Sequence, residues 1–163
     1  MIEMLCNAVV ERLRQRLPAY EVDHFPDAPE RYAWAGASQT LLVGYEGSQY
    51  GAVESMVPMS APRTVNISVT LVTRSLRGDL GAMSALEGVR RALFGWRPEL
   101  TDELTQEVMQ LGFGPLAPTR EGFVDEDQGL WRFVLSFSCT TVAVAEVEPI
   151  NGPPLQGVTF KNA

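Results

Sequence analysis

The sequence predicts an α+β fold, in which a mostly antiparallel sheet carries two helices packed on one of its faces. The first observation is a long alternation of apolar and polar residues at 131–144, and the second is a similar alternation at 64–74. Such alternation is typical of a strand with one buried face. The third observation is that apolar residues at 2–17 and 80–94 recur at the three- and four-residue spacing of amphipathic helices.

The N-terminal part is expected to begin with the first of these helices, which Pro18 ends. Residues 19–25 then predict a short strand, and residues 26–31 predict a loop rich in proline and charge. The apolar run at 39–45 is consistent with a second, buried strand. Glycines and prolines with weak periodicity predict a long loop at 46–62, which a partner could order.

The strand at 64–74 is followed by the second helix. Asp79 is the expected N-cap of this helix, and Gly95 is the expected residue just past its C-terminal end. The segment 99–118 does not predict a single structure, because residues 105–111 fit either a strand or a helix.

The C-terminal part predicts a hairpin of long strands. Residues 120–124 form its expected first strand, residues 125–129 its turn, and the alternation that starts at Leu130 its second strand. One face of that second strand should pack on the second helix. The residues expected in this contact are Phe133, Leu135 and Phe137 from the strand and Leu86, Val89 and Leu93 from the helix.

We expect one domain over residues 1–145, since a chain of 163 residues can bury one sizeable core. Residues 146–163 contain three prolines and two glycines, which predict an extended C-terminal arm. Spaced apolar residues in such an arm suit binding to a neighbouring chain, although a dispensable tail is the alternative. The candidate partner-binding residues of the arm are Ile150, Leu155, Val158 and Phe160.

The net charge of −7 comes from one part of the chain. Residues 99–127 hold eight acidic side chains and one arginine, whereas the remainder is balanced. Duplex DNA needs Lys and Arg against its phosphates, so sequence-specific nucleic-acid binding is not expected. The acidic surface either keeps the protein in solution or docks a basic partner. Its candidate partner-binding residues are Asp125, Glu126 and Asp127.

The sequence also bears on the compartment. No apolar run approaches the ~20 residues that cross a bilayer, and the N-terminus lacks the basic start of a signal peptide. Membrane association and secretion are therefore not expected. The two cysteines, Cys6 and Cys139, are expected to be buried, reduced thiols.

The sequence contains no pattern typical of catalysis or metal binding. A zinc site needs several convergent ligands and a serine triad needs a histidine base, but His24 is the only histidine. Residues 112–117 match the letters of a dinucleotide fingerprint, yet Pro115 and Pro118 interrupt the helix that it requires. We therefore predict no enzyme activity, no cofactor and no metal site. A small-ligand enzyme with an unrecognised site is the weaker alternative.

Several segments together resemble the tail-terminator proteins of Mu-like bacteriophages and prophages. Their order and spacing agree over about residues 1–145. No single segment is diagnostic, because none is a catalytic motif, and the resemblance rests on their combination. The segments are Leu41–Tyr45, Gly47–Tyr50, Arg74–Met83, Leu86–Leu93, Gly95–Pro98 and Asp127–Phe137.

The resemblance implies a structural virion protein whose α+β subunits form a hexameric ring. Such a ring caps the last layer of the tail tube protein, ends polymerisation and presents a surface to the neck or head-completion proteins. In a contractile tail it also meets the sheath protein. The implied location is the virion tail, with assembly in the host cytoplasm. A neck or head-completion protein of the same particle is the alternative.

Overall fold

The computed structural model describes residues 1–34, 39–101 and 108–146. All but the first residue of the expected arm at 146–163 therefore lie outside the described residues. In chain order the elements are α1 (Ile2–Arg16), β1 (Glu21–His24), the short 3-10 helix η1 (Pro29–Arg31), β2 (Thr40–Tyr50), β3 (Ser55–Met56), β4 (Met59–Thr73), α2 (Ala82–Leu93), β5 (Glu99–Thr101), β6 (Val108–Gln110), β7 (Ala117–Asp127) and β8 (Leu130–Val144).

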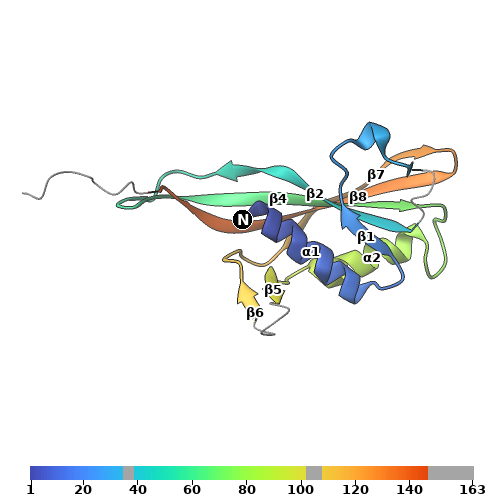
Figure 1. Cartoon of the computed structure of the whole chain (residues 1–163), viewed down its shortest axis with the longest axis horizontal. Coiled ribbons are helices and arrows are strands. Elements are labelled where there is room, and N and C mark those ends of the chain that lie inside the picture. The colour runs from blue at the N-terminus through green and yellow to red at the C-terminus, as the bar shows by residue number, and fades with distance from the viewer. Residues whose placement is uncertain (35–38, 102–107, 147–163) are drawn as a thin grey trace, which may run out of the picture.

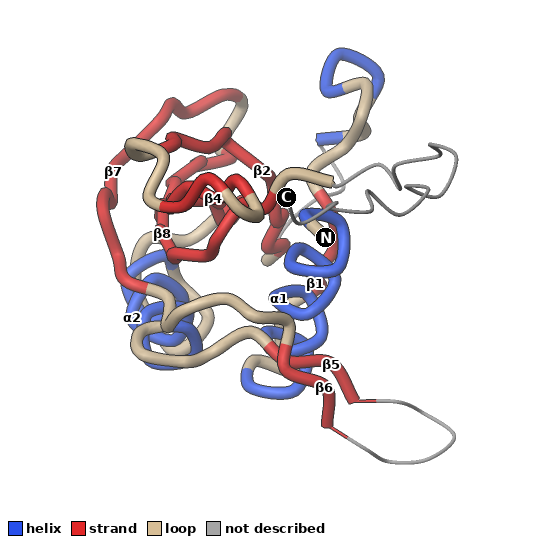
Figure 2. The backbone as a smooth tube through the Cα atoms, turned by 90° about the vertical axis from the view of Figure 1, so that its left-hand side faces the viewer, coloured by secondary structure: helices blue, strands red, loops and turns tan. Residues whose placement is uncertain are grey.

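Six strands form one sheet in the order β1-β2-β4-β8-β7, with β3 paired to the start of β4. β1 runs parallel to β2, and all other neighbours in this sheet are antiparallel. Both helices lie on the same face of the sheet, as the two views show (Figures 1 and 2). The predicted α+β class is confirmed. β5 and β6 form a separate antiparallel pair.

The main core lies between the sheet and the two helices. Every second residue of β4 and β8 points toward the helices, because side chains alternate between the two faces of a strand. The expected contact between β8 and α2 is confirmed. Their shared buried cluster contains Leu135 and Phe137 from β8 and Leu86, Val89 and Leu93 from α2, with partly buried Phe133 packed against it.

At one end of the sheet, the segment that contains η1 covers the opposite face. It brings Trp34 against a small buried cluster formed by Leu42, Val72 and Leu130. The guanidinium of Arg132 lies over the Trp34 ring, 4.9 Å from the ring centroid. This cation–π contact anchors the segment to β8.

The start of α2 differs from the prediction, because Gly81 rather than Asp79 is its N-cap. A main-chain carbonyl of the preceding loop does the capping instead. The N–H of Ala82 donates to the carbonyl of Ser75 at 2.9 Å, so this end of the helix needs no capping side chain. The expected residue past the C-terminus is confirmed, since Gly95 follows the helix with a φ of 78°.

The predicted C-terminal hairpin is confirmed, but its turn is tighter than expected. β7 continues to Asp127, and the turn consists of Gln128 and Gly129, whose φ values are 51° and 80°. Two residues with positive φ form a turn that matches the twist of the flanking strands. The expected turn residues 125–127 therefore lie in β7, where they pair with residues 130–132.

The predicted long loop at 46–62 is wrong. β2 extends to Tyr50, and after the short strand β3 the chain enters β4 at Met59. The reason is tertiary, because β2 pairs with β4 as far as Tyr50 and Arg63, and β8 continues beside β4. Hydrogen bonds to these neighbouring strands favour extended backbone even where the local sequence alternates weakly.

The segment 99–118, whose residues did not predict a single structure, contains the short strands β5 and β6. Of the ambiguous stretch 105–111, residues 108–110 form β6, and residues 105–107 lie outside the described part. Two side chains that follow, Phe113 and Leu116, are buried in the main core.

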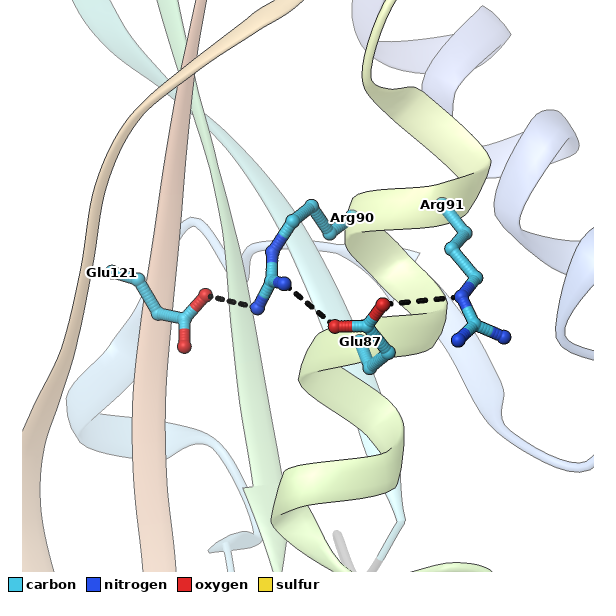
Figure 3. A network of polar contacts seen from close by, with 4 residues as sticks. All are labelled: Glu87, Arg90, Arg91 and Glu121. Atoms are coloured by element: carbon cyan, nitrogen blue, oxygen red, sulfur yellow. Dashed lines mark hydrogen bonds and ion pairs between the residues drawn. The ribbon is translucent and has the colours of Figure 1, made fainter.

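Surface ion pairs connect α2 to β7 (Figure 3). Arg90 contacts Glu87 of its own helix at 2.6 Å and Glu121 of β7 at 3.2 Å. Glu87 also contacts Arg91 at 3.1 Å. These side chains are each at least 41% exposed, so solvent screens the pairs and each adds only ~0.2–1 kcal/mol. The network orients β7 on the helix, while the core supplies most of the stability.

Candidate assembly surface

The long strands continue past the helices as a narrow extension at one end of the molecule (Figure 1). We call this extension the distal ribbon and define it as residues 47–64 and 140–146. It contains the end of β2, all of β3, the start of β4 and the end of β8. Its framework is the pairing of β4 with β8, which runs without interruption from Ser60–Val144 to Thr73–Trp131.

Burial decreases along each long strand as it enters the distal ribbon. In β4, Val65 is fully buried, whereas Met59 is 46% exposed. On the same face of β8, Phe137 is fully buried, whereas Ala143 is partly exposed. The strand pairing is the same in both places, so the change comes from the helices, which cover one part of the sheet and not the other (Figure 1).

The distal ribbon therefore carries several exposed apolar side chains. Exposed apolar side chains gathered at one end of a molecule are typical of a place that another molecule covers. The most exposed members are Met56, the last residue of β3, which is 71% exposed, and Val57, which follows it and is 91% exposed. The other members are Tyr50, Val53, Met59, Val142 and Val144.

Arg63 holds polar groups on one side of the distal ribbon in place. Its guanidinium lies over the ring of Tyr50 at 5.3 Å, and its Nε donates to Ser48 Oγ at 3.0 Å. Ser48 Oγ is also 2.9 Å from the hydroxyl of Tyr45. This hydrogen bond is the main cause that lowers the pKa of Tyr45; Arg63 acts in the same direction and desolvation opposes them. These contacts preorganise the surface.

Both edges of the distal ribbon lack a strand partner within the part of the chain that the structure describes. β1 pairs with β2 only as far as Val43, which leaves the outer edge of residues 45–50 open. β7 begins beside Ser138, and the segment after β6 contacts the next residues of β8: the N–H of Gly114 donates to the carbonyl of Thr140 at 2.7 Å and the hydroxyl of Thr141 to that of Gly112 at 3.1 Å. The outer edge of β8 is therefore open over residues 142–144. Open strand edges present unpaired N–H and C=O groups and can pair with another strand.

A groove of about 670 Å³ lies beside η1, on the sheet face opposite the helices. Two of its carboxylates are already engaged. Asp125 forms a two-point ion pair with Arg132, and Glu46 accepts a hydrogen bond from the hydroxyl of Ser136 at 3.0 Å. Apolar lining residues are Phe25, Trp34, Val124 and Val134.

The three acidic residues predicted to bind a partner lie near the end of the sheet that is farthest from the distal ribbon (Figure 1). Asp125 is half-buried and paired with Arg132. Glu126 accepts a hydrogen bond from the N–H of Gly129 at 2.6 Å, and Asp127 is exposed. Glu126 and Asp127 are therefore both exposed, on opposite faces of β7, while Asp125 has a structural partner.

The four apolar residues predicted to bind a partner through the arm cannot be placed. Their positions lie outside the described residues, so their role stays a prediction. They are Ile150, Leu155, Val158 and Phe160.

The described residues contain no group of three side chains that could hold a metal ion. His24 is exposed. Both cysteines are buried and free, as predicted. Burial raises the pKa of the Cys6 thiol, and it raises that of Cys139 to about 11, which disfavours the nucleophilic thiolate. None of the described helices is long and apolar enough to span a membrane.

A family model described as Gp37 protein matches residues 9–162. The chain belongs to the Gp37 family. No curated protein matches this Gp37-family chain.

The fold of this Gp37-family chain is similar to that of a chain in a solved structure described as the virion of a native gene transfer agent particle. The TM-score is 0.51 and the sequence identity is 16%. The match covers 85% of this chain and 95% of the other. At this identity the likeness shows a shared fold.

The distal ribbon of this Gp37-family protein was not predicted from the sequence as an exposed surface. The signal was present in two places. Met56, Val57 and Met59 are apolar residues within the segment expected to be a loop, and β8 carries two further apolar residues, Val142 and Val144, on the face opposite Phe137. Neither pattern indicates that the helices end before these residues, so their exposure became visible only in the fold.

Proposed function

We propose that this Gp37-family protein is a tail terminator of a phage-like particle. Six copies form a ring that caps the last layer of the tail tube protein, ends its polymerisation and presents a surface to neck or head-completion proteins. The observation that carries the proposal is the distal ribbon, with its exposed apolar side chains and open strand edges, on a fold shared with a chain of a virion.

The two ends of the sheet differ chemically, and a cap needs such a difference. The cap must bind the growing end of the tube, while its own free surface must not bind a further layer of tube protein. The distal ribbon ends in exposed Met56 and Val57, whereas the β7–β8 turn carries exposed Glu126 and Asp127. We assign the apolar end to the tail tube and the acidic end to the neck or head-completion proteins, where a basic partner surface would be complementary.

The groove beside η1 is the feature that an enzyme hypothesis would use. Its volume suits a small ligand, but Asp125 and Glu46 already have partners in Arg132 and Ser136. Such contacts are typical of groups that stabilise a fold. The assembly surface is therefore the better supported basis for function.

Locating the protein in purified particles tests the proposal most directly. We expect electron microscopy to place a six-fold ring at the head-proximal end of the tail tube. Particles made without the protein should contain tubes of uncontrolled length. A location in the neck together with normal tube length would favour the alternative of a neck or head-completion protein, and a two-fold dimer in the particle would contradict the ring.

Charge substitutions test the assignment of the apolar end. Val57→Asp should abolish length control, because a carboxylate at this contact would lose its hydration without a partner. Met83→Asp is the matched control, since Met83 is a 65% exposed apolar residue on α2. Both variants should keep native stability within ~0.5 kcal/mol. Equal loss of length control in both would contradict the assignment.

Salt should affect assembly of the isolated protein. Each copy carries a net charge of −7, so copies repel one another at low ionic strength. Near physiological salt the Debye length falls to ~8 Å, which eases ring closure. We expect light scattering to show a monomer at low concentration and low salt, with any self-association increasing as salt is added. A stable oligomer that dissociates when salt rises would contradict this view.

A further inference from the structure

The distal ribbon has two open edges that belong to different strands. β2 forms one edge over residues 47–50, and β8 forms the other over residues 142–144. A two-fold dimer that paired β2 with β2 would leave the β8 edge of each copy open. If the β2 edge of one copy pairs with the β8 edge of another, both edges gain a partner. Each copy then uses its β2 edge on one side and its β8 edge on the other.

We infer that the β2 edge of the distal ribbon in one copy pairs with the β8 edge of the distal ribbon in the next copy. The inference rests on the proposed function, which supplies the ring. A contact between two different surfaces repeats from copy to copy until the ring closes. The distal ribbons then form one continuous sheet around the ring, without open edges.

The direction of the strands is compatible with this pairing. β2 and β8 are both antiparallel to β4, so they run in the same direction. All copies of a ring have the same orientation relative to its axis, and β2 of one copy therefore forms a parallel pair with β8 of the next. Such a pair uses the backbone groups of both open edges.

The faces of the strands also constrain the pairing. Gln49 pairs with Thr64, and Thr64 pairs with Thr140, so these three side chains share one face of the ribbon. Val142 and Val144 lie on the same face as Thr140 because side chains alternate along β8. If the paired strands of two copies are offset by an even number of residues, the side chains of this face lie on the same side of the joined sheet. An odd offset would place them on opposite sides.

The charge distribution favours a second copy of the chain as the molecule that covers the open edges of the distal ribbon. The chain has a net charge of −7, but the distal ribbon contains only Glu54, Arg63 and Glu146 as charged residues. Copies can therefore approach here with little like-charge repulsion. The acidic residues of β7 remain apart from this contact, at the other end of the sheet.

Pairs of introduced cysteines test the contact. We would make Gln49→Cys with Val142→Cys, and Gln49→Cys with Val144→Cys, in the full chain. Within one copy β4 separates β2 from β8, and Thr140 is the residue opposite Gln49, so two strand spacings place either test position more than ~10 Å from Gln49. A disulfide needs Cα atoms within ~7 Å and must therefore join two copies. Mild oxidation of particles and of concentrated protein should give, for at least one pair, a ladder of bands up to six subunits.

Gln49→Cys with Ala143→Cys is the matched control, since Ala143 is one residue from both test positions but lies on the opposite face of β8. We expect it to remain largely monomeric. The native chain should also remain monomeric, because Cys6 and Cys139 are buried.

Each outcome bears on a different statement. A ladder that stops at the dimer, or equal cross-linking through Ala143→Cys, would overturn the edge pairing. A ring at the tail end without cross-links in either test pair would also overturn it and leave the proposed function standing. A six-subunit ladder from a protein absent from tail ends would support the edge pairing and refute the proposed function.

Discussion

β4 and β8 pass through two regions that share the same pairing but differ in what covers them. Beside α1 and α2, the side chains of Ile67 and Phe137 are fully buried. In the distal ribbon, Met59 lies on the same face of β4 as Ile67, and it is 46% exposed. Apolar alternation therefore predicts a strand with an apolar face, but it does not tell whether the same chain or another molecule covers that face.

Truncation of a core residue should give the largest effect and test the covered region. Phe137→Ala is expected to lower the free energy of unfolding by ~3–5 kcal/mol, because it removes a fully buried ring and leaves a cavity. Denaturant unfolding measures this loss. The control on the same strand is Val142→Ala in the distal ribbon, which should change stability by less than ~1 kcal/mol. Similar losses at both positions would remove the distinction between the two regions.

Alkaline pH should destabilise the protein through Cys139, which lies where β8 leaves the core. Burial raises its pKa from 9.0 to about 11, so the unfolded chain loses the thiol proton first. The stabilising contribution is complete below about pH 9 and is lost as the pH rises toward about 11. The slope cannot exceed ~1.4 kcal/mol per pH unit for one group. Cys139→Ala should flatten this part of the stability profile; an unchanged slope would show that other groups cause it.

The ion pair between α2 and β7 should contribute less. Glu121→Gln removes its 3.2 Å contact with Arg90 and is expected to cost ~0.2–1 kcal/mol at low ionic strength. The difference should nearly vanish in 1 M salt, where the Debye length is ~3 Å. Thermal unfolding at both salt concentrations measures this. A loss above 2 kcal/mol that salt did not reduce would mean that β7 depends on this pair more than on the core.

Removal of the arm should have the smallest effect on stability. Deletion of residues 150–163 is expected to leave the melting temperature nearly unchanged, because the fold described through residue 146 has its core without them. It should nevertheless reduce incorporation into particles if Ile150, Leu155 and Phe160 bind a neighbouring chain. Particle yield and calorimetry measure the two effects. Normal yield would support the dispensable-tail alternative.

Much of the fold could be predicted because its patterns are local. The spacing of apolar residues predicted both helices, and alternation predicted β4 and β8 along with the face that meets α2. Asp79 was a wrong N-cap because the carbonyl of Ser75 already accepts a helix N–H at that end. The conformation of the loop sets the position of that carbonyl, and residue type alone does not predict this conformation.

The candidate assembly surface could be predicted only in part. Sequence analysis identified Asp125, Glu126 and Asp127 from charge alone, and the structure shows that Asp125 is paired with Arg132. It did not identify Met56 and Val57, which are the most exposed apolar residues of the distal ribbon. Charge is a property of each residue, whereas exposure depends on which elements pack nearby.

The sequence by itself determined the two helices, the strands β4 and β8 with the face that meets α2, and the acidic balance, because these depend on residue type and spacing. Only the tertiary structure decided that residues 46–62 are largely strand, that 125–127 belong to β7, and that both edges of the distal ribbon are open in the described chain. The physical reason is that strand pairing and burial are contacts between residues far apart in sequence. Their free energy is set by the neighbour that completes the hydrogen bonds and excludes water.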